Sequence, residues 1–387
     1  HFVAVTDPGS ALLAEAHQSA FRRAFEAPTD VGGRYSALTV FGLLPMALTG
    51  ADLERVVEWA RQLERECSPV LPESANAAVR LGTAIALYAR DGRDKLVLTA
   101  SPAVASFPLW IEQLVAESTG KQGHGIIPVT DESLAAADDY TPDRVFVHYS
   151  VEGDEDSSVL AALDAIAVAG HPVYRIALPE PEALGGEFLR WEIATAAAGA
   201  MLGVNPFDEP DVAAAKQATS NLLELRAAEG GFPAAIPRAA LDGVEVFVAG
   251  DGTPPGESSV AVALSEWLDM RSDGGYVAIL GYFDPSPERE AAVARLRDAL
   301  RARTGLATTF GYGPRYLHST GQLHKGGPAR GLFLVLTADP IEDRAVPGSD
   351  FTLGTLQRAQ ALGDVGTLRE RGRSVLHAHL GWYVDQG

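Results

Sequence analysis

Cysteine is nearly absent from this sequence, which has one, Cys67, in 387 residues. One thiol can form neither an internal disulfide nor a cysteine metal cluster, so a disulfide-stapled scaffold is excluded and a reducing compartment is favoured. Long apolar runs are also lacking. The run Val244–Ala249 is far shorter than the roughly 20 residues of a membrane-spanning helix, and no signal-peptide pattern opens the chain. We therefore expect a cytoplasmic protein.

Positive charge is scarce as well. Lysine and arginine total 31 against 51 aspartates and glutamates, which gives a net charge of -20. Nucleic-acid and anionic-membrane surfaces need a basic face, so neither partner is expected. Basic residues gathered at one place would therefore stand out as a local anion site. The 47% hydrophobic and 21% charged residues are typical of a globular protein, and the length predicts two or three domains.

Apolar strands and helical segments alternate through the middle of the chain. Strands are expected at Lys95–Thr99, Arg144–His148 and Pro172–Ala177, with helices at Pro102–Ser118 and Ser157–Ala169 between them. This alternation predicts an α/β fold built on a parallel sheet.

A second set of elements begins after a glycine-rich break. From Tyr276 onward the order β-α-β, β-α-β predicts a ferredoxin-like α+β layer. The loop Gly311–Gly327 within it is long and polar, which favours a functional role. We predict three domains, at residues 1–92, 93–233 and 234–387.

Four stretches are richer in polar residues, glycine and proline than packing requires. Together they hold an arginine beside two glycines, a carboxylate at a helix end, a lysine within a helix and two histidines in a loop. Such a set suits acid–base chemistry on an anionic ligand. The stretches are Asp30–Ser36, Gln113–Gly125, Asn205–Pro210 with Lys216, and Gly313–Gly327.

These stretches resemble the glucose-6-phosphate isomerase family, which carries the segments GGR[FY]S, ES-x-GK, LHS-x-GQ and NPFDQPGVE-x-x-K. The matches are Gly32–Ser36, Glu117–Lys121, Leu317–Gln322 and Asn205–Lys216. The resemblance implies sugar-isomerase (SIS) domains with flavodoxin-like parallel sheets. It also implies aldose–ketose isomerisation of glucose 6-phosphate and fructose 6-phosphate through an enediolate, without metal or cofactor, in glycolysis and gluconeogenesis.

The resemblance assigns a role to each matched residue. Glu117 would move the proton between C2 and C1, Arg34 would face the enediolate oxygens, and Lys216 and His318 would open the sugar ring. Read without the resemblance, Glu117 is a solvated glutamate, Arg34 a turn arginine paired with Asp30, and Lys216 an exposed helical lysine. Further substrate contacts are expected from Gly33, Gln113, Lys121, Ser319, Gln322 and Lys325.

Other polar residues carry weaker signals. His324 is the second candidate for ring opening, whereas His148, inside an apolar strand, is expected to be structural. His377 and His379 alternate on the last strand, but no third ligand with suitable spacing accompanies them, so no metal site is predicted. The glycine run Gly120–Gly125 lacks the GK[ST] ending of a nucleotide-binding loop.

The chain departs from the family pattern at several places. The LHS-x-GQ segment lies about a hundred residues beyond Lys216, rather than shortly after ES-x-GK, and the lysine segment has Glu209 and Ala213 where glutamine and glutamate are usual. The form of Gly313–Gly327 resembles the isomerase half of bifunctional transaldolase/glucose-6-phosphate isomerases. A serine/threonine-rich phosphate loop that the family carries upstream of the strand matching Phe2–Val5 is expected to be missing.

Three questions stay open at this stage. A non-catalytic sugar-phosphate sensor built on SIS domains would need no base at Glu117. An isomerase that also accepts mannose 6-phosphate would have the same residues. The chain could also form a homodimer, with His318 reaching its site within one subunit or across the interface.

Overall fold

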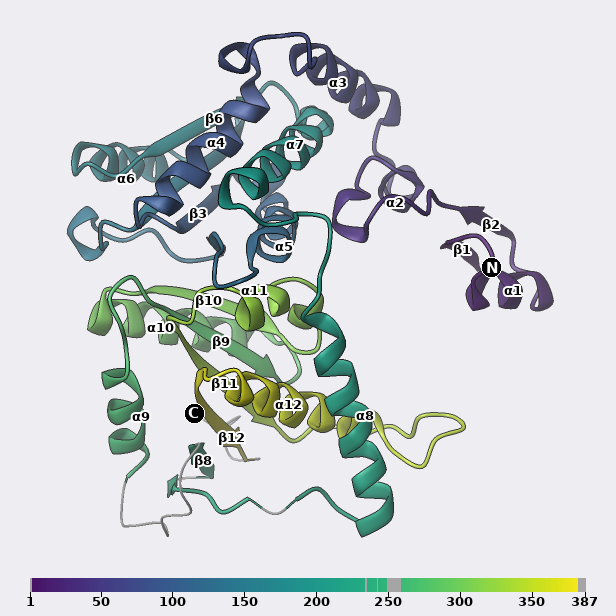
Figure 1. The fold of residues 1–387 in the computed structure, drawn as a ribbon, viewed down its shortest axis with the longest axis vertical. Helices are drawn as coiled ribbons and strands as arrows, with labels where there is room; N and C mark the ends of the chain where they lie inside the picture. Colours follow the sequence, from purple (N-terminus) through teal and green to yellow (C-terminus); the bar gives the residue numbers. More distant parts are fainter. Residues whose placement is uncertain (1, 234, 242, 249–258, 382–387) are drawn as a thin grey trace.

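A computed structural model describes residues 2–233, 235–241, 243–248 and 259–381 of the chain (Figure 1). Its first part is a two-stranded parallel sheet of β1 (Val3–Thr6) and β2 (Arg23–Glu26), joined by α1 (Ala11–Gln18). Helix α2 (Val40–Leu48) leads from this sheet to the rest of the molecule. None of the helices in the described ranges is long and apolar enough to cross a membrane.

The middle of the chain forms a four-stranded parallel sheet in the order β4-β3-β5-β6. The parallel pairing of the Lys95–Thr99 strand is confirmed. Helices α3, α4 and α5 pack against α7 on this unit. Strand β4 was not expected, because it is three residues long and contains a proline. The elements are β3 (Lys95–Ala100), β4 (Ile127–Val129), β5 (Arg144–Val151), β6 (Val173–Leu178), α3 (Leu53–Glu66), α4 (Ala77–Arg90), α5 (Phe107–Thr119), α6 (Ser157–Val168) and α7 (Leu184–Leu202).

The C-terminal sheet has six strands in the order β10-β9-β11-β12-β8-β7. Its first four strands are parallel to one another, and β8 and β7 continue the sheet antiparallel. The elements are β7 (Ala239–Leu241), β8 (Val244–Val248), β9 (Tyr276–Tyr282), β10 (Ala307–Tyr312), β11 (Gly331–Ala338), β12 (Ser374–Leu380), α8 (Val212–Glu229), α9 (Val260–Asp269), α10 (Pro287–Thr304), α11 (Gly321–Gly326) and α12 (Leu353–Glu370).

The expected ferredoxin-like layer is therefore wrong. In that layer neighbouring strands run antiparallel, whereas every connection between β9, β10, β11 and β12 here returns the chain to the same end of the sheet. The connection from β10 to β11 includes the short helix α11, so it is long enough for the crossover that parallel strands require. Both larger sheets consequently share one strand order. In each, the first strand along the chain (β3 or β9) lies between the second (β4 or β10) and the third (β5 or β11).

The two larger sheets share a hydrophobic core. One buried cluster contains Val97 and Phe146 from the middle sheet together with Tyr276 and Phe333 from the C-terminal sheet. Helix α8 leaves the middle unit and packs along α12 of the C-terminal unit (Figure 1). The domain limits at residues 92 and 233 stay predictions.

Candidate active site

Arg34 connects three of the polar stretches singled out in the sequence. It lies in a single 3₁₀ turn and is buried. Its Nε donates to Ser118 Oγ at 2.8 Å, and its Nη1 donates to Glu209 Oε2 at 2.9 Å. Its Nη2 donates to the carbonyl oxygens of Pro206, at 2.8 Å, and Asp208, at 2.9 Å. The guanidinium thus joins the GGRYS turn to the end of α5 and to the Asn205–Pro210 segment, rather than pairing with Asp30.

Glu117 lies beside this arginine in the last turn of α5. Its Oε1 is 3.4 Å from Arg34 Nη1, and its Oε2 accepts a hydrogen bond from Gln113 Nε2 at 3.4 Å. Burial raises the pKa of the Glu117 carboxyl, the Arg34 charge opposes that rise, and the Glu209 carboxylate adds to it. The net direction is upward, so Glu117 takes up a proton more readily than a solvated glutamate does.

Lys121 fixes the Asn205–Pro210 segment from the other side. Its Nζ donates to Asp208 Oδ1 at 2.7 Å and to the carbonyl oxygen of Asn205. Burial lowers the pKa of Lys121, although the Asp208 carboxylate opposes that change. Nη1 and Nη2 of Arg34 and the ammonium of Lys121 therefore all donate to the loop that precedes α8.

The fold returns the LHS-x-GQ segment to the same place. Gln322 is fully buried, and its Nε2 donates to the carbonyl oxygen of Gly120 at 3.0 Å and to Asp211 Oδ2 at 2.7 Å. Gln322 Oε1 accepts from the backbone N–H of Asp211 at 2.9 Å. In addition, the N–H of Gly123 donates to Gly326 O at 2.9 Å. The LHS-x-GQ segment is far from ES-x-GK in the sequence but close to it in the fold, because α11 docks on the turn that follows Glu117.

His318 ends the turn Arg315–His318 just before this docked helix, and it is exposed. Ser319 is buried, with its hydroxyl donating to Tyr316 O at 3.4 Å. Gly33 faces open space, since no atom lies within 4 Å of the position that a Cβ would occupy.

Two basic candidates from the same loop lie in the protein interior instead. Lys325 is buried, and its Nζ pairs with Asp364 Oδ1 at 2.6 Å. His324 is buried against Tyr276 and Phe333, and burial together with the neighbouring Lys325 lowers its pKa to about 3. The Lys325 ammonium is paired with Asp364 and the His324 ring is packed against aromatic rings, so neither is presented to a ligand in this conformation.

Lys216 is exposed on α8. Ala213, the departure in the lysine segment, lies among the residues whose side chains are not described. His148 is buried with its Nδ1 2.9 Å from Thr99 Oγ1, as a structural histidine should be. No three histidine, cysteine, aspartate or glutamate side chains gather as a metal site would need, within the ranges that the structure describes.

Sequence reasoning missed several residues of this site. Ser118 accepts the Arg34 hydrogen bond and lies 3.1 Å from the Tyr35 hydroxyl oxygen. Ser118 and Tyr35 both lie inside matched motifs, so the sequence could have marked them as site residues. It could not have shown that they contact each other. Glu192 on α7 was also missed: burial raises its pKa to about 8, and its Oε1 has no hydrogen-bond partner. Its signal is only an acidic residue in a largely apolar helix that also contains Glu187 and Arg190.

Comparison with known proteins finds relatives that match part of this chain. A glucose-6-phosphate isomerase from Leptospira biflexa is 30% identical in an alignment of 229 residues that covers 49% of this chain and 50% of that protein. One from Thermus thermophilus is 31% identical over 266 residues, 58% of this chain and 63% of that protein. The chain is similar to glucose-6-phosphate isomerases over about half of its length.

The match is partial in both directions. The chain spans about half to under two thirds of the length of these curated isomerases, and no family model matches it. Among solved structures, a hypothetical protein from Thermus thermophilus aligns with a TM-score of 0.51 at 27% identity, over 57% of this chain and 62% of that one.

Proposed function

We propose that the chain interconverts glucose 6-phosphate and fructose 6-phosphate. The observation that carries this proposal is the buried Glu117 carboxylate, 3.4 Å from Arg34, at the point where three family motifs meet. A carboxylate with a raised pKa can both take up and return a proton near neutral pH. The arginine beside it supplies a positive charge for an oxygen that becomes negative during the reaction.

The chemistry proceeds by proton transfer in two halves. The Glu117 carboxylate removes the proton from C2 of the open-chain aldose, the C–H electron pair becomes the C1–C2 double bond, and the carbonyl pair moves onto O1. The hydroxyl proton on O2 passes to O1, and the carboxyl group then returns the first proton to C1 as O2 becomes the ketone oxygen. The Arg34 guanidinium beside the carboxylate offsets the enediolate charge. No electron leaves the sugar, so the step is redox-neutral overall.

Ring opening is assigned to His318 and Lys216. Support for His318 comes from the docking of α11, which holds its loop against the turn after Glu117 through Gln322. An imidazole suits the transfer of a proton to or from the ring oxygen near neutral pH. Support for Lys216 is its place in the lysine motif and its exposure on α8.

Two finer assignments rest on the sequence resemblance. The form of Gly313–Gly327 resembles the isomerase half of a transaldolase/isomerase polypeptide, and we propose that origin for the chain. Mannose 6-phosphate as a further substrate is the second candidate within the same chemistry. A non-catalytic sensor is disfavoured, because such a protein has no use for a buried base beside an arginine.

Substitution of Glu117 tests the proposal. Glu117→Gln keeps the shape of the side chain but removes the base, so turnover of fructose 6-phosphate in a coupled dehydrogenase assay should fall by roughly 10² to 10⁴. Binding of glucose 6-phosphate, measured by calorimetry, should survive. A variant that keeps most of its activity places the proton shuttle elsewhere. A wild-type protein that binds the sugar phosphate without turnover is a sensor.

Glu112→Gln is a matched control. Glu112 lies on the same helix and is also buried, and burial raises its pKa to about 7. Its carboxylate accepts from Thr130 Oγ1 at 2.8 Å, away from the Arg34 cluster. We therefore expect turnover in this variant to stay within a few-fold of wild type.

A further inference from the structure

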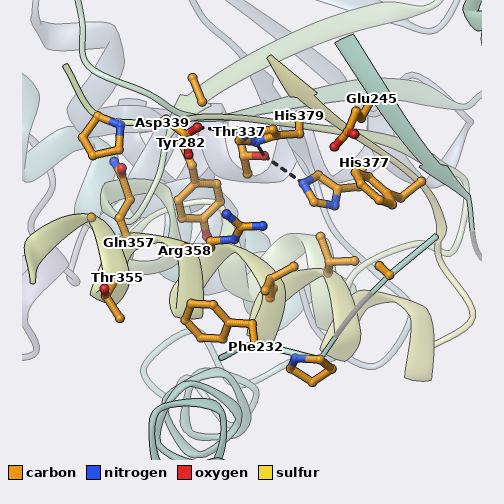
Figure 2. Close-up of a pocket in the computed structure, with 18 of the residues that line it drawn as sticks. Phe232, Glu245, Tyr282, Thr337, Asp339, Thr355, Gln357, Arg358, His377 and His379 are labelled. Carbon is orange, nitrogen blue, oxygen red and sulfur yellow. Dashed lines mark hydrogen bonds and ion pairs between the residues drawn. The ribbon is translucent and has the colours of Figure 1, made fainter. Parts of the chain in front are cut away.

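A cavity lies apart from the site described above. It has a volume of about 660 Å³ and opens at the carboxyl ends of β9, β11 and β12 (Figure 2). Tyr282 and Thr337 form its floor at the ends of β9 and β11, helix α12 forms one wall, and Phe232 faces α12. It shares no residue with the Arg34–Glu117 cluster.

The position of the cavity is typical of a binding site. Strand β10 lies on one side of β9 and β11 on the other, so the chain reverses direction across the sheet between β9 and β11. Open parallel sheets bind ligands in the crevice outside the carboxyl ends of the strands at such a reversal. The volume lies within the range of about 300 to 1,000 Å³ that small-molecule sites occupy.

Two arginines of α12 line this cavity. Arg358 points into it between Tyr282 and Phe232 (Figure 2), with its guanidinium carbon 6.0 Å from the centre of the Phe232 ring. Arg369 donates from Nη2 to Phe247 O at 3.2 Å, and its buried Nε has no hydrogen-bond partner. Neither guanidinium forms an ion pair with any carboxylate in the described part of the chain. In a chain of net charge -20, two guanidinium groups that share one cavity without a carboxylate partner favour an anionic ligand there.

Two histidines, His377 and His379, line the cavity with the arginines and contact Thr337. Thr337 Oγ1 lies 2.9 Å from His377 Nε2 and 3.0 Å from His379 Nδ1. Burial, with the positive charge of Arg369 beside it, lowers the pKa of His377 to about 4, so this ring is neutral at pH 7.

Three carboxylates also border the cavity. Asp343 is engaged with Thr352 and the N–H of Gly354 at the start of α12. Asp339 lies 3.7 Å from His379 Nε2, and Glu245 is exposed on β8. None of them pairs with Arg358 or Arg369, so these three carboxylates leave both guanidinium charges available to an anion.

We propose that this cavity binds a small phosphorylated metabolite, whose phosphate is held by Arg358 and Arg369. Guanidinium groups match the geometry of phosphate oxygens and bind them through paired, charge-assisted hydrogen bonds. The apolar Phe232 and Tyr282 rings would face the remainder of the molecule. This site is distinct from the proposed isomerase site and does not depend on it.

The test uses inorganic phosphate as the probe and the histidine rings as local reporters. In ¹⁵N-labelled full-length chain, at constant pH and constant ionic strength set with chloride, the imidazole resonances of His377 and His379 are followed during a phosphate titration. Their assignment comes from His377→Gln and His379→Gln. We expect saturable shifts of both rings, about tenfold weaker apparent affinity in Arg369→Gln and in Arg358→Gln, and no saturation in the double variant.

Two controls separate this site from the candidate active site and from general anion effects. Arg65→Gln, which removes an exposed arginine of α3, should leave the titration unchanged. The His318 resonance reports on the isomerase site, and Arg34→Gln should affect that resonance without affecting His377. Three results would each overturn the proposal: histidine shifts that do not saturate with phosphate, a phosphate affinity of the double variant equal to that of wild type, or the same shifts with acetate. Arg358 is exposed, so Arg358→Gln decides the outcome even if Arg369→Gln fails to fold.

Discussion

At the scale of single residues, Glu209 is the most informative departure from the family motif. Glutamine is usual at this position, and here a half-exposed carboxylate accepts a hydrogen bond from Arg34 at 2.9 Å. Arg34 Nη1 therefore faces two carboxylates, and Glu117 Oε1, at 3.4 Å, is the more distant of them. The substitution therefore weakens the interaction that would keep Glu117 ionised.

Glu209→Gln should consequently lower the pKa of Glu117. Burial raises that pKa, the Arg34 charge lowers it, and the Glu209 charge raises it again. Removing the Glu209 charge also leaves Arg34 free to move closer to Glu117, and both effects favour the carboxylate. The acidic limb of the pH profile of kcat/KM, where Glu117 becomes deprotonated, should move to lower pH. A shift to higher pH would contradict this account of the site.

At the scale of elements, the contact between α5 and α11 decides whether the two halves of the site meet. An added Cβ on Gly120 would lie 2.4 Å from the Cα of Leu323. The φ angle of Gly120 is -76°, which residues other than glycine also adopt. The close approach of α11 to the ES-x-GK turn thus requires glycine at this position for steric reasons alone.

Gly120→Ala should push α11 away from the turn that follows Glu117. We expect a loss of roughly 1 to 3 kcal/mol in the free energy of unfolding, typical of overpacking, measured by urea denaturation. Isomerase activity should fall more than binding of the sugar phosphate, because the His318 loop moves while Arg34 and Glu117 stay in place. Gly231→Ala is the control, since no atom lies within 4 Å of its added methyl group. Equal stability of the two variants would contradict the steric argument.

The sequence pattern predicted which segments are helices and strands far better than how they pair. The periodicity of Tyr276–Tyr282 identifies a strand, but nothing in it says that β10 and β11 lie on either side in parallel. The resemblance of the motifs predicted that Arg34 and Glu117 belong to one site. It could not foresee that Lys325, in a polar stretch, is buried against Asp364, because that partner lies on α12 and is reached only through the tertiary fold.

At the scale of the whole molecule, a polar seam joins the two larger sheets beside their shared core. Glu132 is almost wholly buried there, and its Oε2 accepts from Arg144 Nη1 on β5 at 3.0 Å. Its Oε1 accepts from the N–H of Thr308 on β10 at 3.1 Å and from the Thr308 hydroxyl at 2.8 Å. One carboxylate therefore connects the unit that carries Glu117 to the unit that carries the LHS-x-GQ segment.

Glu132→Gln should loosen this connection without changing the volume of the side chain. The fully buried Arg144 would lose its closest carboxylate, and removing one partner of a buried ion pair costs about 3 to 5 kcal/mol. We expect a loss of about that size in urea denaturation, with faster hydrogen exchange in both β5 and β10. Asp164→Asn, which removes the partner of Arg175 in an exposed pair, should cost under about 1 kcal/mol. If exchange rises in only one of the two strands, Glu132 stabilises its own unit but does not couple the two.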